Sequence, residues 1–283
     1  MRFNFDKNTL YSLIAYFKHM IYLNYTAIQE IELRESLSTV SAHHLQAAKF
    51  CDLQLNRMCN IFEYLMDDEP DVDKKKLQSF EVGDLVDEIA SQFSSATSGV
   101  RPLSVEVKTK IQDGAVIMID KLKFELIVLN ILYCCVKERV HKKNDNVKIT
   151  ISVSETKDKV VFTIRDNNPA LVSEPADDVF AMPAMFEEGN ATLQAETLMR
   201  FSLNVALKSV QQMKGELLYT PLKGGNRFVV RLPKAQESLH RASSPAIYVP
   251  TYSYYNELFA DIRLERILEK IIQEFGNEGA FSR

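Results

Sequence analysis

A seam of apolar residues near the start of the chain constrains the fold more than any other feature. Its members recur at alternating steps of three and four, broken only at Asn24, and they are Leu10, Ile14, Phe17, Ile21, Ile28 and Ile31. This spacing predicts an amphipathic helix to about Arg34, with nearly a heptad pattern. His19 lies two positions, about 200° of helical rotation, from both Phe17 and Ile21, so we expect its imidazole to face away from the seam.

A second helix of similar length is expected after a short break at residues 36–39, which supplies turn and capping residues. Its apolar positions are Leu45, Phe50, Leu53, Leu55, Met58, Ile61, Phe62 and Leu65. A hairpin of two such helices carries more apolar surface than it can bury alone. The pattern therefore predicts pairing with a second copy into a dimeric four-helix bundle.

The pattern changes after the acidic, proline-containing segment 67–76, which is expected to be a hinge. Beyond it the sequence predicts helices at 81–93, 121–138 and 196–213, strands at 104–111, 115–119, 146–154, 159–165, 216–219 and 228–232, and a loop-like stretch at 169–194. We therefore expect an α+β protein, a long antiparallel helical hairpin followed by an α/β sandwich. The expected domains are 1–72, 73–234 and a tail at 235–283 that ends in an amphipathic helix.

Composition excludes several classes of function. The chain has 283 residues and a net charge of −4, without the basic surplus that nucleic-acid binding usually needs. Its longest apolar run, Leu126–Val136, is too short to span a membrane, so we expect no direct membrane contact. The four cysteines suggest neither a disulfide framework nor a metal site, which favours a cytoplasmic location, either alone or as part of a longer membrane-bound sensor.

Four segments carry short sequence patterns in a fixed order. They read HMIYLNYTAI at 19–28, DKLKFELIVLNILYCCVKE at 120–138, VVFTIRDNNPAL at 160–171 and MKGELLYTPLKGGNRFVVRLP at 213–233. Together with the order of the elements, they resemble the cytoplasmic core of two-component sensor histidine kinases. In that family a dimerisation and histidine-phosphotransfer hairpin precedes an ATPase-type domain of the gyrase, chaperone and kinase superfamily. The resemblance also extends to histidine phosphotransfer proteins of the same design.

The resemblance implies specific site residues. The first segment aligns with the family's H-E-x-x-x-P-L-x-x-I, which makes His19 the candidate phosphoacceptor. Asn130 and Lys137 fall in register with the family's N-L-L-x-N-A-x-K helix, and Asp166 takes the place of the carboxylate that accepts the adenine amino proton. These residues are thus candidates for cofactor binding, with ATP and magnesium as the implied cofactors and no residue assigned to the metal.

Several positions depart from the family pattern. Met20 replaces the acidic general base, and Cys134 replaces the asparagine that holds Mg²⁺, although a neutral thiol is a poor ligand for this hard cation. Glycines of the base-binding loop and of the G-L-G-L lid are replaced as well, and a proline of the first motif is lost. The residues at these positions are Asn24, Asn168, Ala170, Arg200 and Ser202.

We therefore expect a two-component signal transduction protein that resembles a histidine kinase, with His19 as phosphoacceptor and a degenerate ATP site. Two alternatives stay open: an ATP-independent phosphotransfer protein, and a non-catalytic pseudokinase scaffold that binds a response regulator. Whether the chain autophosphorylates with ATP is not decided by these residues. The expected partners are a second copy, through the hairpin, and the receiver domain of a response regulator.

Overall fold

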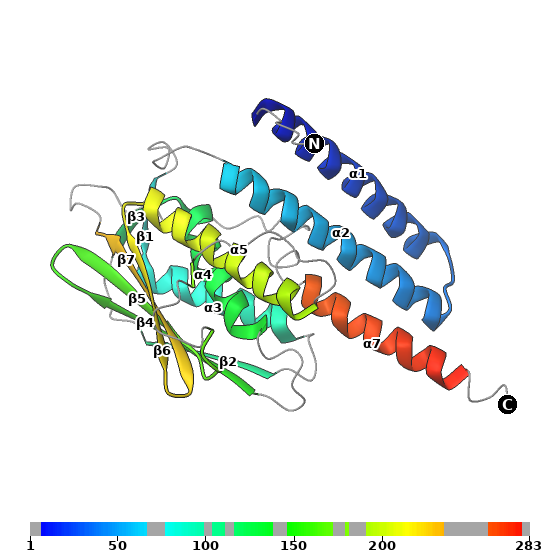
Figure 1. Cartoon of the computed structure of the whole chain (residues 1–283). Coiled ribbons are helices and arrows are strands. Elements are labelled where there is room, and N and C mark those ends of the chain that lie inside the picture. The colour runs from blue at the N-terminus through cyan, green and yellow to red at the C-terminus, as the bar shows by residue number, and fades with distance from the viewer. Residues whose placement is uncertain are drawn as a thin grey trace. The chain divides into compact units, whose positions relative to one another are not determined.

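The structure, a computed structural model, describes residues 7–66, 77–98, 104–110, 116–137, 146–171, 179–180, 191–234 and 260–278. The chain forms two compact units (Figure 1). One, the helical unit, contains residues 1–67 and 252–283, and the other, the α/β unit, contains residues 68–251. The expected hinge at 67–76 and most of the linker after residue 234 lie outside the described residues.

The expected hairpin is present in the helical unit. Helix α1 spans Lys7–Arg34, and helix α2 spans Thr39–Met66. The hydroxyl of Ser38 accepts a hydrogen bond from the backbone N–H of Ser41 at 3.1 Å, which caps the start of α2. Apolar residues spaced by seven on α1 are buried against the unit's interior, as the periodicity requires: they are Ile14, Ile21 and Ile28.

Part of the expected seam is not buried within one chain. Phe17 is 49% exposed and Ile31 is 42% exposed, although both were expected at the packed face. Two paired helices can cover only one side of each other, so the flank of a wide apolar stripe stays open unless another surface covers it. The hairpin thus keeps an uncovered apolar strip along α1.

The tail helix α7, Ala260–Glu278, belongs to the same unit and packs against α2. Its side chains Ile267 and Ile271 form a buried cluster with Ala47 of α2, and Phe50 and Leu264 pack on the edge of that cluster. The amphipathic face read from the sequence is therefore the face that contacts the hairpin. In the part of this unit that the structure describes, α7 thus adds a third helix to the hairpin.

The α/β unit is built on a five-stranded sheet of order β2-β4-β5-β7-β6, in which β2 and β4 are parallel and all other neighbours antiparallel (Figure 1). The strands span Ser104–Lys110 (β2), Asn146–Glu155 (β4), Lys159–Arg165 (β5), Glu216–Leu222 (β6) and Gly225–Pro233 (β7). A separate antiparallel pair joins β1, Gln78–Glu81, to β3, Val116–Ile119. The sequence did not predict β1.

The described residues of this unit also form the helices α3 at Val82–Ser98, α4 at Lys121–Lys137 and α5 at Ala191–Gln212. Helix α4 is buried along most of its length and packs against α5, and its Phe124 ring lies 5.0 Å from the Phe162 ring of β5. Helix α5 begins earlier than the expected residue 196. The α+β class, a helical hairpin followed by an α/β sandwich, is confirmed.

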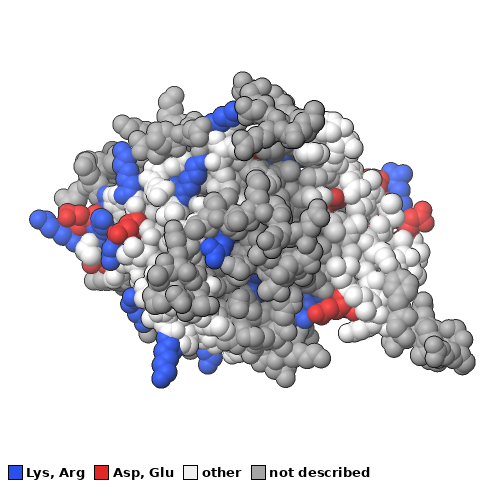
Figure 2. All heavy atoms as spheres, viewed as in Figure 1, with Lys and Arg blue, Asp and Glu red and all other residues white. Residues whose placement is uncertain are grey.

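Charged side chains of both signs lie on the face drawn in Figure 2. On the face in Figure 2, the described Lys, Arg, Asp and Glu side chains are scattered among uncharged atoms. A single basic patch is not seen on that face, which agrees with the net charge of −4.

Ile267→Ala tests the packing of α7 on α2. Ile267 is 4% exposed, so truncation removes buried apolar contacts and should lower the free energy of unfolding by about 2–4 kcal/mol. Ile272→Ala is the matched control, because this side chain is 69% exposed, and its effect should stay within about 0.5 kcal/mol. Urea unfolding followed by circular dichroism measures both, and equal losses would contradict the packing.

Candidate functional site

His19 lies on α1 with an exposed side chain, as its position relative to the buried Ile21 predicted. The residue after it, Met20, is 47% exposed and offers a thioether, which cannot take up a proton at neutral pH. Lys18, on the other side, forms an ion pair with Glu63 of α2. The imidazole is therefore accessible to a partner, without a carboxylate at the next position to act as its base.

Asn24, which stands at the family's proline position, has a structural role in the hairpin. Its amide nitrogen donates to both carboxylate oxygens of Asp52, at 3.0 and 2.8 Å. Asp52 is 5% exposed, and burial raises the pKa of its carboxyl while the hydrogen bond from Asn24 opposes that shift. Asparagine at this position therefore joins α1 to α2 where the family motif has a helix-breaking residue.

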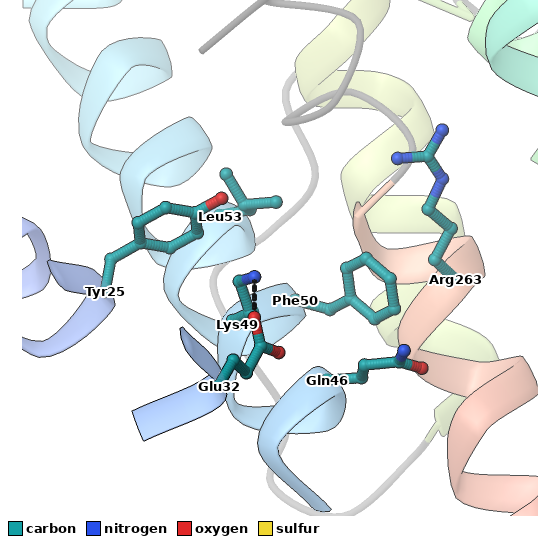
Figure 3. Close-up of a pocket in the computed structure, with 7 residues that line it drawn as sticks. All are labelled: Tyr25, Glu32, Gln46, Lys49, Phe50, Leu53 and Arg263. Atoms are coloured by element: carbon teal, nitrogen blue, oxygen red, sulfur yellow. Dashed lines mark hydrogen bonds and ion pairs between the residues drawn. The ribbon is translucent and has the colours of Figure 1, made fainter. Parts of the chain in front are cut away.

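A pocket of about 340 Å³ lies among the three helices of the same unit (Figure 3). Lys49 pairs with Glu32 at 2.6 Å and lies 5.5 Å from the ring centre of Tyr25. Figure 3 shows Phe50 on the side of this ion pair toward Arg263. None of the site residues expected from the sequence lines this pocket.

In the α/β unit, Asp166 follows β5 and is engaged by other parts of the domain. Its Oδ1 accepts hydrogen bonds from the backbone N–H of Asn168 at 2.8 Å, the backbone N–H of Asn226 at 3.1 Å and the Asn226 amide nitrogen at 3.0 Å. The same amide nitrogen lies 3.3 Å from Oδ2. Asp166 is 8% exposed and Asn226 is fully buried.

The end of α4 joins the same network. The side-chain amide of Asn168 donates to the backbone carbonyl of Cys135. Burial raises the pKa of the Cys135 thiol well above its usual value, and the neighbouring Asp166 adds to this through its charge and a hydrogen bond. The thiol therefore stays protonated beside the carboxylate.

The other expected cofactor residues are buried in α4. Asn130 is fully buried, and its amide nitrogen donates to the Leu126 carbonyl of the same helix at 2.7 Å. Lys137 is 3% exposed. Cys134 is fully buried, with its thiol 3.6 Å from the Met199 carbonyl of α5. Helix α5 thus packs directly on the residue that replaces the magnesium-binding asparagine.

The segment expected to correspond to the nucleotide lid lies inside α5. Arg200, Phe201, Ser202 and Leu203 fall in the middle of Ala191–Gln212, and the last three are buried. Backbone N–H groups bind phosphates at the start of a helix, where they have no intrahelical acceptor. In a helix interior the same groups bond to carbonyls one turn earlier, so this segment offers no phosphate-binding terminus.

Of the expected residues, the structure brings Asp166 together with Asn168 through the hydrogen bond from the Asn168 N–H and places Asn130 and Lys137 on α4. Sequence reasoning missed Asn226 as a member of this site. Its signal was available, because it follows Gly225 at the threonine position of the G-x-G-T-x-F pattern. Glycine is required there, since a Cβ at Gly225 would collide with the Asp166 carbonyl oxygen.

Comparison with known proteins identifies the class of this domain. Residues 119–236 match the family described as histidine kinase-, DNA gyrase B-, and HSP90-like ATPase. Full-length ShkA, solved in complex with AMPPNP, has a TM-score of 0.63 at 15% identity, over 82% of this chain and 46% of ShkA. The Acinetobacter baumannii histidine kinase AdeS has a TM-score of 0.51 at 10% identity, over 77% of this chain and 97% of AdeS. No curated protein sequence matches the chain.

Residues 119–236 therefore form an ATPase-type domain of the histidine-kinase, gyrase and HSP90 kind, and the chain shares with ShkA and AdeS a fold in which a helical hairpin precedes this domain. Among the described residues, no helix is long and apolar enough to cross a membrane, and no group of three or more His, Cys, Asp or Glu side chains could hold a metal ion.

The residues present do not fit a nucleotide held as the family motifs would hold it. The carboxylate of Asp166 is engaged by Asn226, the thiol of Cys134 is buried against α5, and the lid segment is a helix interior.

Glu125 on α4 makes the stability of this domain pH-dependent. Burial raises the pKa of this carboxyl to about 7, with Lys121 opposing the shift and Glu88 and Asp120 adding to it. The pKa of Glu125 is higher in the folded protein than in the unfolded chain, so protonation of this carboxyl stabilises the fold. This contribution of Glu125 to the free energy of unfolding is complete below about pH 4.5 and is lost as pH rises through 7. Glu125→Gln should therefore stabilise the protein by about 1–3 kcal/mol at pH 8 relative to its effect at pH 4.5.

Urea unfolding of the wild type and the variant at pH 4.5 and 8 measures this difference. Glu81→Gln is the matched control, because Glu81 is exposed at the end of β1. The same pH dependence in wild type and Glu125→Gln would contradict the assignment.

Proposed function

We propose that this protein acts in two-component signalling as an ATP-independent phosphotransfer protein, with His19 carrying the phosphoryl group. Two features together support this proposal: the exposed imidazole of His19 on α1, and an ATPase-like domain in which the Asp166 carboxylate is hydrogen-bonded by Asn226 of the same chain. In this proposal residues 1–72 form the dimerisation and phosphotransfer module, and residues 73–234 form a degenerate ATPase-like domain, in the cytoplasm.

The donor is the aspartyl phosphate of a response-regulator receiver domain. A nitrogen of the His19 imidazole attacks the phosphorus, the new P–N bond forms as the P–O bond to the aspartate breaks, and the receiver carboxylate leaves. The imidazole proton is released to water, and the reverse transfer regenerates the neutral ring. The receiver supplies its own metal ion, so this chain needs to provide only an accessible imidazole for the transfer.

Transfer places smaller demands on these residues than autophosphorylation does. A kinase must position the γ-phosphate and neutralise it, and it needs a base near the imidazole. Met20 at the base position, Cys134 at the metal position and a lid segment inside α5 support the transfer mechanism instead.

The proposed dimer uses the uncovered apolar strip of the hairpin. On α1, Leu13, Met20 and Ile31 lie within about 20° of one another around the helix, with Phe17 about 40° away. All four are more than 40% exposed. On α2, Leu55 and Phe62 are exposed with a spacing of seven. Such strips are the a/d-type positions that a second hairpin covers in a four-helix bundle.

A charge in this strip should dissociate the dimer. Leu13→Glu is expected to raise the dimer dissociation constant at least about 100-fold, because a carboxylate would be buried without a partner. Leu33→Glu is the matched control: Leu33 is 82% exposed and lies about 200° around α1 from Leu13. Sedimentation equilibrium measures both, and a monomeric wild type or an equally weakened control would contradict the proposed interface.

Phosphotransfer itself is tested with receiver domains labelled by ³²P-acetyl phosphate. We expect transfer of label to the wild-type chain, as an acid-labile and alkali-stable phosphohistidine, and complete loss of label in His19→Ala. His44→Ala, which removes another exposed histidine of the hairpin, should transfer normally. Label that persists in His19→Ala would contradict the assignment, and receiver binding without any transfer would favour the pseudokinase scaffold.

A further inference from the structure

Asn226 is the residue through which the polar network around Asp166 is closed. We propose that the Asn226 carboxamide occupies the place where an adenine amino group would hydrogen-bond to the Asp166 carboxylate. The Asp166–Asn226 pair is then a structural cross-link, and it keeps adenine from binding at this end of the domain. The inference deepens the proposed ATP-independent function and rests on it.

The acceptor capacity of Asp166 Oδ1 is used within the chain. An ionised carboxylate offers about four lone-pair sites, two on each oxygen. Three donors reach Oδ1, namely the backbone N–H of Asn168 and both the backbone and side-chain nitrogens of Asn226, while the Asn226 amide also reaches Oδ2 at 3.3 Å. An adenine amino group would have to displace a donor from Oδ1 or share Oδ2 with the Asn226 amide.

The carboxamide of Asn226 is equally satisfied. Its amide nitrogen donates to Asp166 and to the Pro169 carbonyl at 2.9 Å. Its oxygen accepts from the Tyr219 hydroxyl at 2.8 Å and from the backbone N–H of Leu171 at 3.1 Å. Both N–H groups and both lone pairs are therefore used, which fixes the orientation of the amide.

The backbone holds Asn226 against Asp166 as well. The N–H of Asp166 donates to the Asn226 carbonyl at 3.2 Å, while the N–H of Asn226 donates to the Asp166 carboxylate. Next to this pair, Arg227 of β7 is in register with Arg165 of β5. The strand pairing thus presents the side chain to the carboxylate, and Gly225 permits the close approach.

Opening this site would break several hydrogen bonds at once. If the amide of Asn226 moved away, the Pro169 carbonyl and the Tyr219 hydroxyl would each lose a hydrogen bond, while the Leu171 N–H would keep the one that it donates to the Tyr219 hydroxyl at 3.0 Å. A bound base can replace the contact of Asn226 with Asp166 but not these other hydrogen bonds. The network therefore favours the closed form over a base-bound form.

A double-mutant cycle between Asp166→Ala and Asn226→Ala tests the cross-link, measured by equilibrium unfolding of the full chain. Each single variant should be destabilised, and the double variant should be little worse than either one, with a coupling of at least tenfold in the unfolding constant. Asp166→Ala combined with Glu155→Ala is the control pair, since Glu155 is paired with Lys234, and its effects should be additive. Additive effects for Asp166 and Asn226 would overturn the proposal.

Ligand binding to the wild-type protein gives a second measurement. Adenosine at millimolar concentration should leave the ¹H–¹⁵N signals of wild type unchanged, and the Asn226 side-chain NH₂ should exchange slowly with solvent because it is fully buried. Adenosine binding that Asp166→Asn abolishes, or fast exchange of this NH₂, would overturn the proposal. These results are independent of His19 labelling by a receiver, so the two proposals can fail separately.

Discussion

A carboxylate accepts about four hydrogen bonds, and the donors can come from the protein or from a ligand. When a buried carboxylate is bonded by the protein's own donors, less of it remains for a ligand. In this protein Asp166 is surrounded by donors from its own turn and from β7. On the neighbouring helix α4, the Cys134 thiol lies against the Met199 carbonyl of α5, so this position too is filled from within the domain. The sheet and helices of an ATPase-type domain are thus kept while its polar groups are satisfied internally.

The helical unit follows from a simpler constraint. Helix α1 carries a wider apolar stripe than one neighbouring helix can cover, so Ile14, Ile21 and Ile28 are buried and the flanking residues stay exposed. His19 lies outside both groups, on the remaining face. One periodic pattern therefore accounts for the hairpin, for the open strip and for the accessibility of the imidazole, while α7 covers part of α2.

Much of this architecture could be predicted from the sequence, because long helices and the strands β4 and β5 have strong periods. The strand β1 was missed since its four residues are too few to show alternation. The start of α5 was placed late because its first turns lack an apolar period. The G-x-G-T-x-F pattern marks the position of Asn226, but its contact with Asp166 depends on the pairing of β5 with β7, which joins residues far apart in the sequence.

The most direct test of ATP independence is titration of the intact protein with Mg-ATP, followed by thermal unfolding and by ³²P incorporation from the γ-phosphate. A protein that binds nucleotide gains about 2.7 kcal/mol at a hundredfold excess over its dissociation constant. We predict no shift at millimolar Mg-ATP and no label on His19. A concentration-dependent rise in unfolding temperature with γ-phosphate label on His19 would contradict this account.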